Sequence, residues 1–220
     1  MNILLASANQ HKVREFRSIF TGHRVLTPPE LGLDFDYEET GDTFFANAFG
    51  KAETLFQLFQ LHRESAARES TTASADLNGD QLAVIADDSG ICVDALDGGP
   101  GVYSARFGRN EGARSDEDRT RLLLQKMEGV EERGAHYVCC MVAVTGPDRF
   151  LCAQETWHGR IAHARSNGSG GFGYDPVFLL PERGVTVADI SNEEKHAQSH
   201  RGKAARTLFR LLTHAGVPAM

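Results

Sequence analysis

A short apolar run that ends abruptly in two acids is the clearest pattern along the chain. Residues 82–86 read Leu-Ala-Val-Ile-Ala, and Asp87-Asp88-Ser89-Gly90 follow directly. The apolar run predicts a buried strand, and the Ser-Gly step predicts a turn at its C-terminal end, where open α/β sheets bind ligands. Adjacent carboxylates there need a cation or a basic partner, although a solvated turn or a helix cap would explain Asp87 and Asp88 equally well.

The N-terminal region has the pattern of a strand, a polar loop and a helix. Residues 3–6 are apolar, residues 7–12 are polar, and apolar side chains then recur at helical spacing over residues 13–20. N–H groups at the start of a helix bind anions, and Lys12 adds a positive charge suited to phosphate. The loop lacks the glycines of a P-loop, so ordinary helix capping is the alternative interpretation.

A second helix is predicted to begin after Asp42 or Thr43, either of which can cap it. Its apolar positions recur every three or four residues and predict a buried stripe, made of Phe45, Phe49, Ala52, Phe56 and Phe59. On another face of the same helix, Thr43, Asn47 and Lys51 align. That row indicates either a solvated face or one wall of a binding site.

The middle of the chain adds a helix, a hairpin and an insertion. Residues 115–127 open with a capping box and predict a helix with a structural role. Residues 135–145 and 150–162 flank a Gly-Pro-Asp turn and predict an antiparallel hairpin, so the sheet is mixed. Residues 63–81 are rich in small and polar side chains and predict a flexible surface insertion.

Two segments near the C-terminus carry candidate binding chemistry. Residues 167–176 combine glycines with Phe172, Tyr174 and Asp175. Aromatic rings held between glycines make good platforms for a planar base, and a loop that tucks Phe172 inward is the alternative.

A helix that opens with a capping box at Ser191 is predicted to be interrupted at residues 199–202, before a last amphipathic helix that starts at Lys203. Lys195, His200 and Arg201 lie near this interruption. They form either a surface basic cluster or part of a site.

Composition and charge limit the class of protein. The 220 residues, 41% of them hydrophobic, suffice for one domain over residues 1–220. No run approaches the ~20 apolar residues that span a bilayer, and the start does not read as a signal peptide, so we expect a cytoplasmic protein with no membrane partner. A net charge of −7 argues against nucleic acid as a partner but permits a small anion with a divalent metal. The four cysteines form no CxxC pair and are expected to be reduced core thiols.

Six short motifs follow one another along nearly the whole chain. They are Ser7-x-Asn9-x-x-Lys12, the stretch from Glu39-Thr40-Gly41 to Asn47-Ala48-x-x-Lys51, Ala86-Asp87-Asp88-Ser89-Gly90, Gly99-Pro100-Gly101, Gly170-Gly171-Phe172-Gly173-Tyr174-Asp175-Pro176 and Ser199-His200-Arg201-Gly202. Together they resemble the inosine triphosphate pyrophosphatase family, the non-canonical purine nucleoside-triphosphate pyrophosphatases. The resemblance implies a two-lobed, single-domain α/β fold, with a long mixed sheet flanked by helices and a central active-site cleft, in a homodimer.

The same resemblance implies a reaction and a set of site residues. The reaction is the Mg²⁺-dependent hydrolysis of ITP, dITP or XTP to the monophosphate and pyrophosphate, which removes these purine nucleotides from the pool. The implied metal ligands are Glu39, with Glu38 as the alternative, and Asp88, which is also the implied general base. The implied substrate contacts are Ser7, Ala8, Asn9, Gln10, His11, Lys12, Asn47, Lys51, Ser89, Phe172, Gly173, Tyr174, Asp175, Lys195, His200 and Arg201.

The resemblance also suggests how the base could be selected, and two alternative functions remain open. Donors from Arg201, Lys195 and the Phe172 loop, aimed at the carbonyl of hypoxanthine or xanthine, would be left unpaired by ATP. Guanine shares that carbonyl, so the rejection of GTP needs a further element. The alternatives are a pyrophosphatase for modified pyrimidine triphosphates and a nucleotide-binding regulator without turnover.

Overall fold

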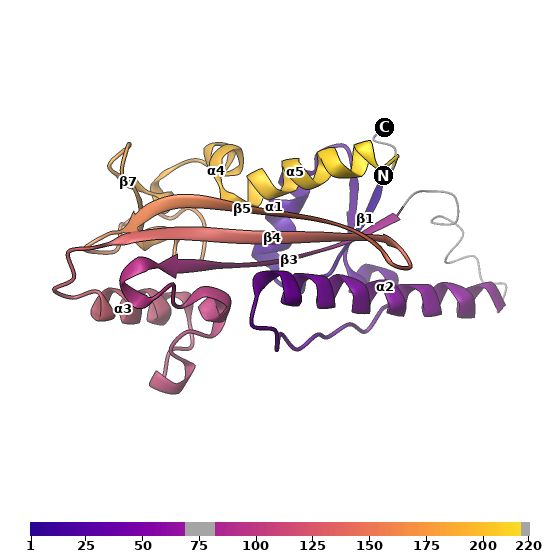
Figure 1. Ribbon diagram of the computed structural model, residues 1–220, viewed down its shortest axis with the longest axis horizontal. Helices are drawn as coiled ribbons and strands as arrows, with labels where there is room; N and C mark the ends of the chain where they lie inside the picture. The colour runs from indigo at the N-terminus through magenta and orange to yellow at the C-terminus, as the bar shows by residue number, and fades with distance from the viewer. Residues whose placement is uncertain (69–81, 217–220) are drawn as a thin grey trace. The chain divides into compact units, whose positions relative to one another are not determined.

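The computed structural model describes residues 1–68 and 82–216, which hold one seven-stranded mixed sheet in the order β2-β1-β3-β4-β5-β6-β7 (Figure 1). The strands are β1 (Asn2–Leu5), β2 (Arg24–Leu26), β3 (Leu82–Val93), β4 (Gly134–Gly146), β5 (Arg149–Ile161), β6 (Phe178–Leu180) and β7 (Val185–Thr186). The helices are α1 (Gln10–Ile19), α2 (Phe44–Arg68), α3 (Asp116–Lys126), α4 (Asn192–Gln198) and α5 (His200–His214). The α/β fold class and the mixed sheet predicted from the sequence are confirmed.

The sheet is parallel at one edge and antiparallel at the other. Strand β1 pairs in parallel with β2 and with β3, so that Asn2 lies opposite Arg24 on one side and Leu82 on the other. Strand β6 pairs antiparallel with β5 and with β7. Strands β4 and β5 are neighbours joined by residues 147–148, which confirms the predicted hairpin.

The chain divides into two compact units. Unit 1 comprises Met1–Asp88, Cys140–Ala153 and Ala204–Met220, and unit 2 comprises Ser89–Cys139 and Gln154–Lys203. The chain passes between the units within β3, β4, β5 and α5, so each of these elements contributes residues to both. A single domain over residues 1–220 stays a prediction.

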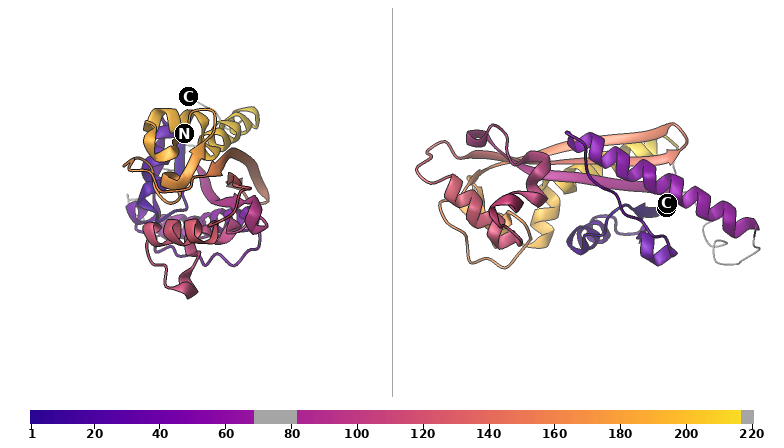
Figure 2. Two further views of the ribbon diagram at one scale, coloured as in Figure 1. Left: turned by 90° about the vertical axis from the view of Figure 1, so that its left-hand side faces the viewer. Right: turned by 90° about the horizontal axis from the view of Figure 1, so that it is seen from below.

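Helices cover both faces of the strands of unit 1. Figures 1 and 2 show α2 and α5 on opposite faces. Side chains alternate along a strand, so Leu4 and Val84 face α2 while Ile3 and Ile85 face the other way, and all four are buried. This two-sided burial explains why β1 and the start of β3 are apolar without a break.

Helix α2 differs from its prediction in the residues that it buries and in its length. Thr43 caps it as expected, since the Ala46 N–H donates to Thr43 Oγ1 at 3.1 Å. Phe45 is 40% exposed, and it contacts Phe49 and Phe150 rather than the core. The helix continues to Arg68, so residues 63–68 are helical and not part of a flexible insertion. Residues 69–81 lie outside the described residues.

Strand β3 also differs from its prediction. It runs through Asp87, Asp88 and Ser89 to Val93, with no turn after the acidic pair. Asp87 is 1% exposed and Asp88 is 4% exposed, so the solvated-turn interpretation is wrong. The acids stay within the strand because side chains from other segments supply their partners.

Unit 2 is organised around its own apolar cluster, and both helix starts have the predicted capping boxes. Ser115 opens α3, which buries Leu123, and Ser191 opens α4. The last helix starts at His200 and not at Lys203, because Ser199 accepts the Gly202 N–H at 3.1 Å and so caps it.

The structure also bears on the expectations for membrane-spanning helices and for the cysteines. Within residues 1–68 and 82–216, each helix is too short or too polar to cross a bilayer. All four cysteines are free thiols, as predicted. The sulfur atoms of Cys140 and Cys152 lie 3.6 Å apart without a covalent bond.

Candidate active site

The acidic pair of β3 is neutralised by two lysines of unit 1. Lys12, in the first turn of α1, places Nζ 3.0 Å from Asp87 Oδ2. Lys51, on α2, places Nζ 3.9 Å from Asp88 Oδ1. Asn47, one turn before Lys51, donates from Nδ2 to Asp88 Oδ2 at 3.0 Å. Asn47 and Lys51 of the row on α2 are therefore buried against the acidic pair, and the interpretation of these two residues as a solvated face is wrong.

Glu39 joins this acidic cluster from the segment before α2. Lys51 Nζ donates to Glu39 Oε1 at 2.6 Å and to the Asp87 carbonyl at 2.7 Å. Glu39 and Asp88, the two expected metal ligands, thus contact the same ammonium. Glu38 is exposed, so the geometry favours Glu39 between the two.

Gly41 lets the segment that carries Glu39 lie against α2. Asn47 Oδ1 accepts the Gly41 N–H at 2.8 Å, and Asn47 Nδ2 donates to the Gly41 carbonyl at 3.3 Å. A Cβ at this position would lie 2.7 Å from Asn47 Oδ1, so the close approach requires glycine. Asn47 therefore holds the Glu39 segment and Asp88 together.

Burial and charge shift the pKa values in the acidic cluster. Burial, together with the negative charge of Glu39, raises the pKa of Asp88, although Lys51 and Lys12 act to lower it. Burial lowers the pKa of Lys51, but the attraction of Asp88, Asp87 and Glu39 outweighs it, and the pKa lies above its ordinary value. Lys51 is therefore charged at neutral pH, while Asp88 is better able to accept a proton than an exposed aspartate.

The donor set of the acidic cluster fits Mg²⁺. Glu39 and Asp88 offer carboxylate oxygens, which this ion prefers. Among the residues that the structure describes, no three His, Cys, Asp or Glu side chains gather as a ready metal site. Magnesium in nucleotide enzymes is commonly held by one or two carboxylates together with phosphate oxygens, and two carboxylates match that arrangement.

The N-terminal loop, whose residues stay predicted substrate contacts, is held by hydrogen bonds of its own. Asn9 Oδ1 caps α1 by accepting the N–H groups of His11 and Lys12, at 2.9 and 3.3 Å. Those two donors already have a partner and are not free for an anion. Ser7 accepts the Asn9 N–H at 3.2 Å, and the side chains of Ala8, Gln10 and His11 are exposed. From this loop, Lys12 reaches the acidic pair, through its contact with Asp87.

A second cluster lies in unit 2 around Asp175, and we call it the Asp175 cluster. Asp175 Oδ2 accepts Lys195 Nζ at 2.8 Å and the Phe172 N–H at 2.8 Å. Lys195 Nζ and Arg201 Cζ lie 4.7 and 5.7 Å from the centre of the Phe172 ring. Arg201 also donates to Ser89 Oγ at 2.8 Å.

The burial of the residues in and around the Asp175 cluster shows which of the interpretations from the sequence are wrong. Lys195, His200 and Arg201 are all buried, so they do not form a surface basic cluster. Phe172 is half-buried beside two cations rather than tucked into the core. The Phe172 N–H donates to Asp175, which leaves Lys195 and Arg201 as the remaining expected donors for a base.

Other residues of the glycine-rich segment hold its shape. Tyr174 is buried, and its hydroxyl donates to the Ser104 carbonyl at 2.9 Å. The Gly173 N–H donates to Asp116 Oδ2 at 2.9 Å. These polar groups are used within the fold, so Tyr174 is not the exposed platform that the sequence suggested.

Three residues of the two clusters were absent from the expected site. Asp87 belongs to the acidic pair, but the sequence predicts no separate role for it. In the structure it pairs with Lys12. Gly41 belongs to the Glu39-Thr40-Gly41 motif, but the sequence does not show that its backbone bonds to Asn47. Tyr137, in β4, donates to Asp175 Oδ1 at 3.1 Å. Its signal is a polar-tipped ring in an otherwise apolar strand, since a buried tyrosine hydroxyl needs an acceptor.

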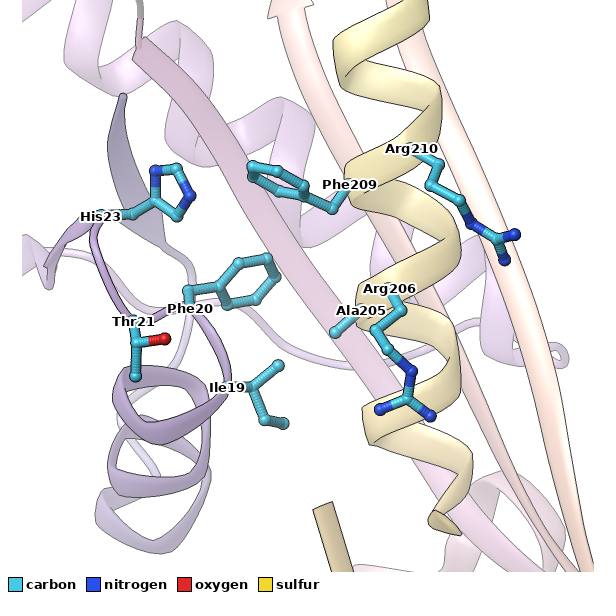
Figure 3. Close-up of a pocket in the computed structure, with 8 residues that line it drawn as sticks. All are labelled: Ile19, Phe20, Thr21, His23, Ala205, Arg206, Phe209 and Arg210. Atoms are coloured by element: carbon cyan, nitrogen blue, oxygen red, sulfur yellow. The ribbon is translucent and has the colours of Figure 1, made fainter. Parts of the chain in front are cut away.

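A cavity of about 580 Å³ lies elsewhere in unit 1, against α1 and α5 (Figure 3). Figure 3 shows His23, Phe20 and Phe209 facing one another, and the His23 and Phe209 rings are 4.8 Å apart. Burial, and then the N-terminal amine, lower the pKa of His23, so its ring is neutral at pH 7. None of the expected site residues lines this cavity.

The α/β fold and the buried lysines of the two clusters define a protein with charged groups suited to an anionic ligand. More narrowly, the chain belongs to the Ham1 family, whose profile matches residues 3–211. This confirms the family expected from the six motifs, and with it the enzyme class of nucleoside-triphosphate pyrophosphatases.

Relatives and solved structures agree with this membership. The dITP/XTP pyrophosphatase of Treponema denticola is 40% identical over 213 residues, which cover 96% of this chain and 98% of that protein. The one of Pectobacterium atrosepticum is 40% identical over 220 residues, covering 97% and 98%. The Staphylococcus aureus Ham1 protein has a solved structure that is 37% identical, with a TM-score of 0.75, and the match covers 98% of this chain and 100% of that one.

Proposed function

We propose that this chain hydrolyses dITP, XTP and ITP to the nucleoside monophosphate and pyrophosphate, with Mg²⁺, and so removes these nucleotides from the pool. The observation that carries the proposal is the contact of Glu39 and Asp88 with one lysine ammonium, because it gathers two carboxylates and a cation at one place. Membership of the Ham1 family and the names of the relatives support the substrate class.

The acidic cluster provides the groups that hydrolysis at a phosphate requires. Lys12 and Lys51 offset the negative charge of the phosphate chain and of the transition state. Asp88, with a pKa raised by burial, accepts the proton of the attacking water. When bound between Glu39 and Asp88, Mg²⁺ supplies further positive charge at the phosphate oxygens. The cluster therefore holds the phosphate chain and carries the chemistry.

The Asp175 cluster provides the groups that a planar base requires. The Phe172 ring offers a face for stacking, and Lys195 and Arg201 are cations that can donate to a carbonyl oxygen. Adenine carries an amino group where hypoxanthine and xanthine carry that oxygen, so ATP would leave buried donors unpaired. We assign the base to this cluster. A homodimer and a cytoplasmic location remain predictions from the family resemblance and the sequence.

A panel of nucleoside triphosphates tests the function. With Mg²⁺, the purified protein is expected to release pyrophosphate from dITP, XTP and ITP with a kcat/KM on the order of 10² above that for ATP, and EDTA is expected to abolish the release. Asp88→Asn is expected to lower turnover by a factor on the order of 10² or more while the protein stays folded.

Each alternative function has its own outcome in the same panel. Faster release from modified pyrimidine triphosphates than from any purine would favour the pyrimidine enzyme. Binding of dITP without release of pyrophosphate would favour the regulator. Near-normal turnover in Asp88→Asn would remove the proton-accepting role of this residue.

A further inference from the structure

We infer that Tyr137 is a positioning residue of the base site: its hydroxyl fixes the Asp175 carboxylate, and through it the positions of Lys195 and the Phe172 loop. The inference deepens the proposed function, and it rests on the assignment of the base to the Asp175 cluster. The Tyr137 hydroxyl and the Lys195 ammonium donate to different oxygens of the same carboxylate, so Tyr137 acts through Asp175.

The contacts of Asp175 divide between its two oxygens. Oδ2 accepts both the Lys195 ammonium and the Phe172 N–H, each at 2.8 Å. Oδ1 accepts the Tyr137 hydroxyl at 3.1 Å. The three donors come from β4, α4 and the glycine-rich loop, so they hold the carboxylate in one orientation. Without the Tyr137 donor, Oδ1 loses this hydrogen bond, and the carboxylate is held through the two hydrogen bonds to Oδ2.

Close packing holds the Tyr137 hydroxyl in place. The Tyr137 ring is nearly parallel to that of His200, with centres 4.6 Å apart and planes 9° apart, and its centre lies 4.4 Å from the Phe178 ring. Rings locked by packing lose little further freedom when their polar tip makes a hydrogen bond. Tyr137 is therefore a rigid support behind the carboxylate.

The phenol is also a permanent donor. Burial, followed by the negative charge of Asp175, raises the pKa of Tyr137 well above its ordinary value, so the hydroxyl keeps its proton throughout the neutral and alkaline range. Hydrogen bonds to a carboxylate are stronger than those between neutral groups. A hydroxyl placed only to satisfy a core tyrosine could use any carbonyl, whereas this one bonds the carboxylate that holds Lys195.

Tyr137→Phe tests the inference, because it keeps the packed ring and removes the hydroxyl alone. We expect the KM for dITP and the dissociation constant for the product dIMP to rise about tenfold, the effect of one hydrogen bond to a charged group. The kcat is expected to stay within about twofold, because base binding is shared by ground and transition states. Pyrophosphate release gives the first two values, and calorimetry gives the third.

Two comparisons separate positioning from a general loss of stability. Leu123→Val weakens the same apolar cluster of unit 2 but removes none of the three hydrogen bonds to Asp175, and it is expected to lower the melting temperature and leave KM unchanged. In an Asp175→Ala background, which removes both acceptor oxygens, Tyr137→Phe is expected to have no further effect on dIMP binding, since both changes break the same link.

The outcomes distinguish this inference from the proposed function. An unchanged KM and dIMP affinity in Tyr137→Phe, an equal rise of KM in Leu123→Val, or additive effects with Asp175→Ala would each overturn it. If the wild type binds dIMP but hydrolyses none of the triphosphates, the proposed function fails while the dIMP affinities still test Tyr137. If the wild type neither binds dIMP nor hydrolyses any of the triphosphates, both are overturned.

Discussion

Replacing Lys51 by methionine removes one charge from the centre of the acidic cluster while keeping a chain of similar length. In the wild type, Lys51 contacts Glu39, the Asp87 carbonyl and Asp88, and it is buried. In the variant, Glu39, Asp87 and Asp88 lose this partner, while Lys12 still pairs with Asp87. The change should therefore destabilise the fold and also abolish most of the activity.

The size of the effect follows from the burial of the partners. Removing one member of a buried ion pair leaves an uncompensated charge and costs about 3–5 kcal/mol. An exposed pair contributes only about 0.2–1 kcal/mol. Lys126 provides such a pair, because its Nζ lies 3.0 Å from Glu111 Oε2 and the two side chains are 35% and 50% accessible. Lys126→Met is thus a matched control for the same chemical change.

The destabilisation should also depend on pH, with a definite sign. Attraction to Lys51 is one of the causes that lower the pKa of Asp88, so the variant raises this pKa further above the ordinary value of 3.8. Between 3.8 and the raised pKa, the folded variant binds more protons than the unfolded chain, and its stability falls as the pH rises. Lys51 itself, with a raised pKa, stays charged in the wild type over this range.

Urea unfolding followed by circular dichroism at pH 5 and pH 8 measures both effects. The loss in free energy of unfolding should be largest at pH 8 for Lys51→Met and small at both values for Lys126→Met. Pyrophosphate release should fall by a factor on the order of 10²–10³ in Lys51→Met alone. Equal losses in the two variants, or a loss in Lys51→Met that does not change with pH, would refute the argument from buried charge.

Two further predictions use matched pairs of variants. Glu39→Gln is expected to lower kcat on the order of 10²-fold, because Glu39 contacts Lys51. Glu38→Gln is expected to lower kcat by less than about twofold, because Glu38 is exposed. Equal losses of pyrophosphate release in the two variants would contradict the choice of Glu39 as the metal ligand. Gly184→Ala is expected to cost about 1–2 kcal/mol for its positive φ, whereas Gly171→Ala, with nearly the same φ, should cost more and weaken dIMP binding. The added Cβ of Gly171→Ala would overlap Asp175 Oδ2, while that of Gly184→Ala meets open space. Urea unfolding measures the two losses of stability, and calorimetry measures dIMP binding. Equal values for the two variants would disprove the close approach of Gly171 to Asp175.

The sequence predicts well those features that neighbouring residues determine. The hairpin of β4 and β5 and the capping boxes at Ser115 and Ser191 follow from turn and capping chemistry within a few positions. The apolar start of β3 follows from burial on both faces. These elements were therefore predictable without knowledge of the rest of the fold.

Whether a polar residue is buried or solvated depends on partners that are distant in the sequence. Asp87 and Asp88 predict a turn only if they lack cations, and Lys12 and Lys51 come from helices elsewhere in the chain. The same uncertainty applied to the face of α2 that carries Lys51, which is buried rather than solvated. Tyr137 was missed because a single aromatic ring in an apolar strand is typical of the core. Only tertiary contacts decide such cases.

The points at which the chain passes between its two units all fall inside regular structure. The crossings lie at residues 88–89 in β3, 139–140 in β4, 153–154 in β5 and 203–204 in α5. Proteases prefer exposed loops, and domains that separate cleanly are joined by linkers. Cutting this chain at a crossing would break a hydrogen-bonded strand or helix. Neither half is therefore a sensible fragment to express alone, and chimeras with other family members should exchange loops rather than halves.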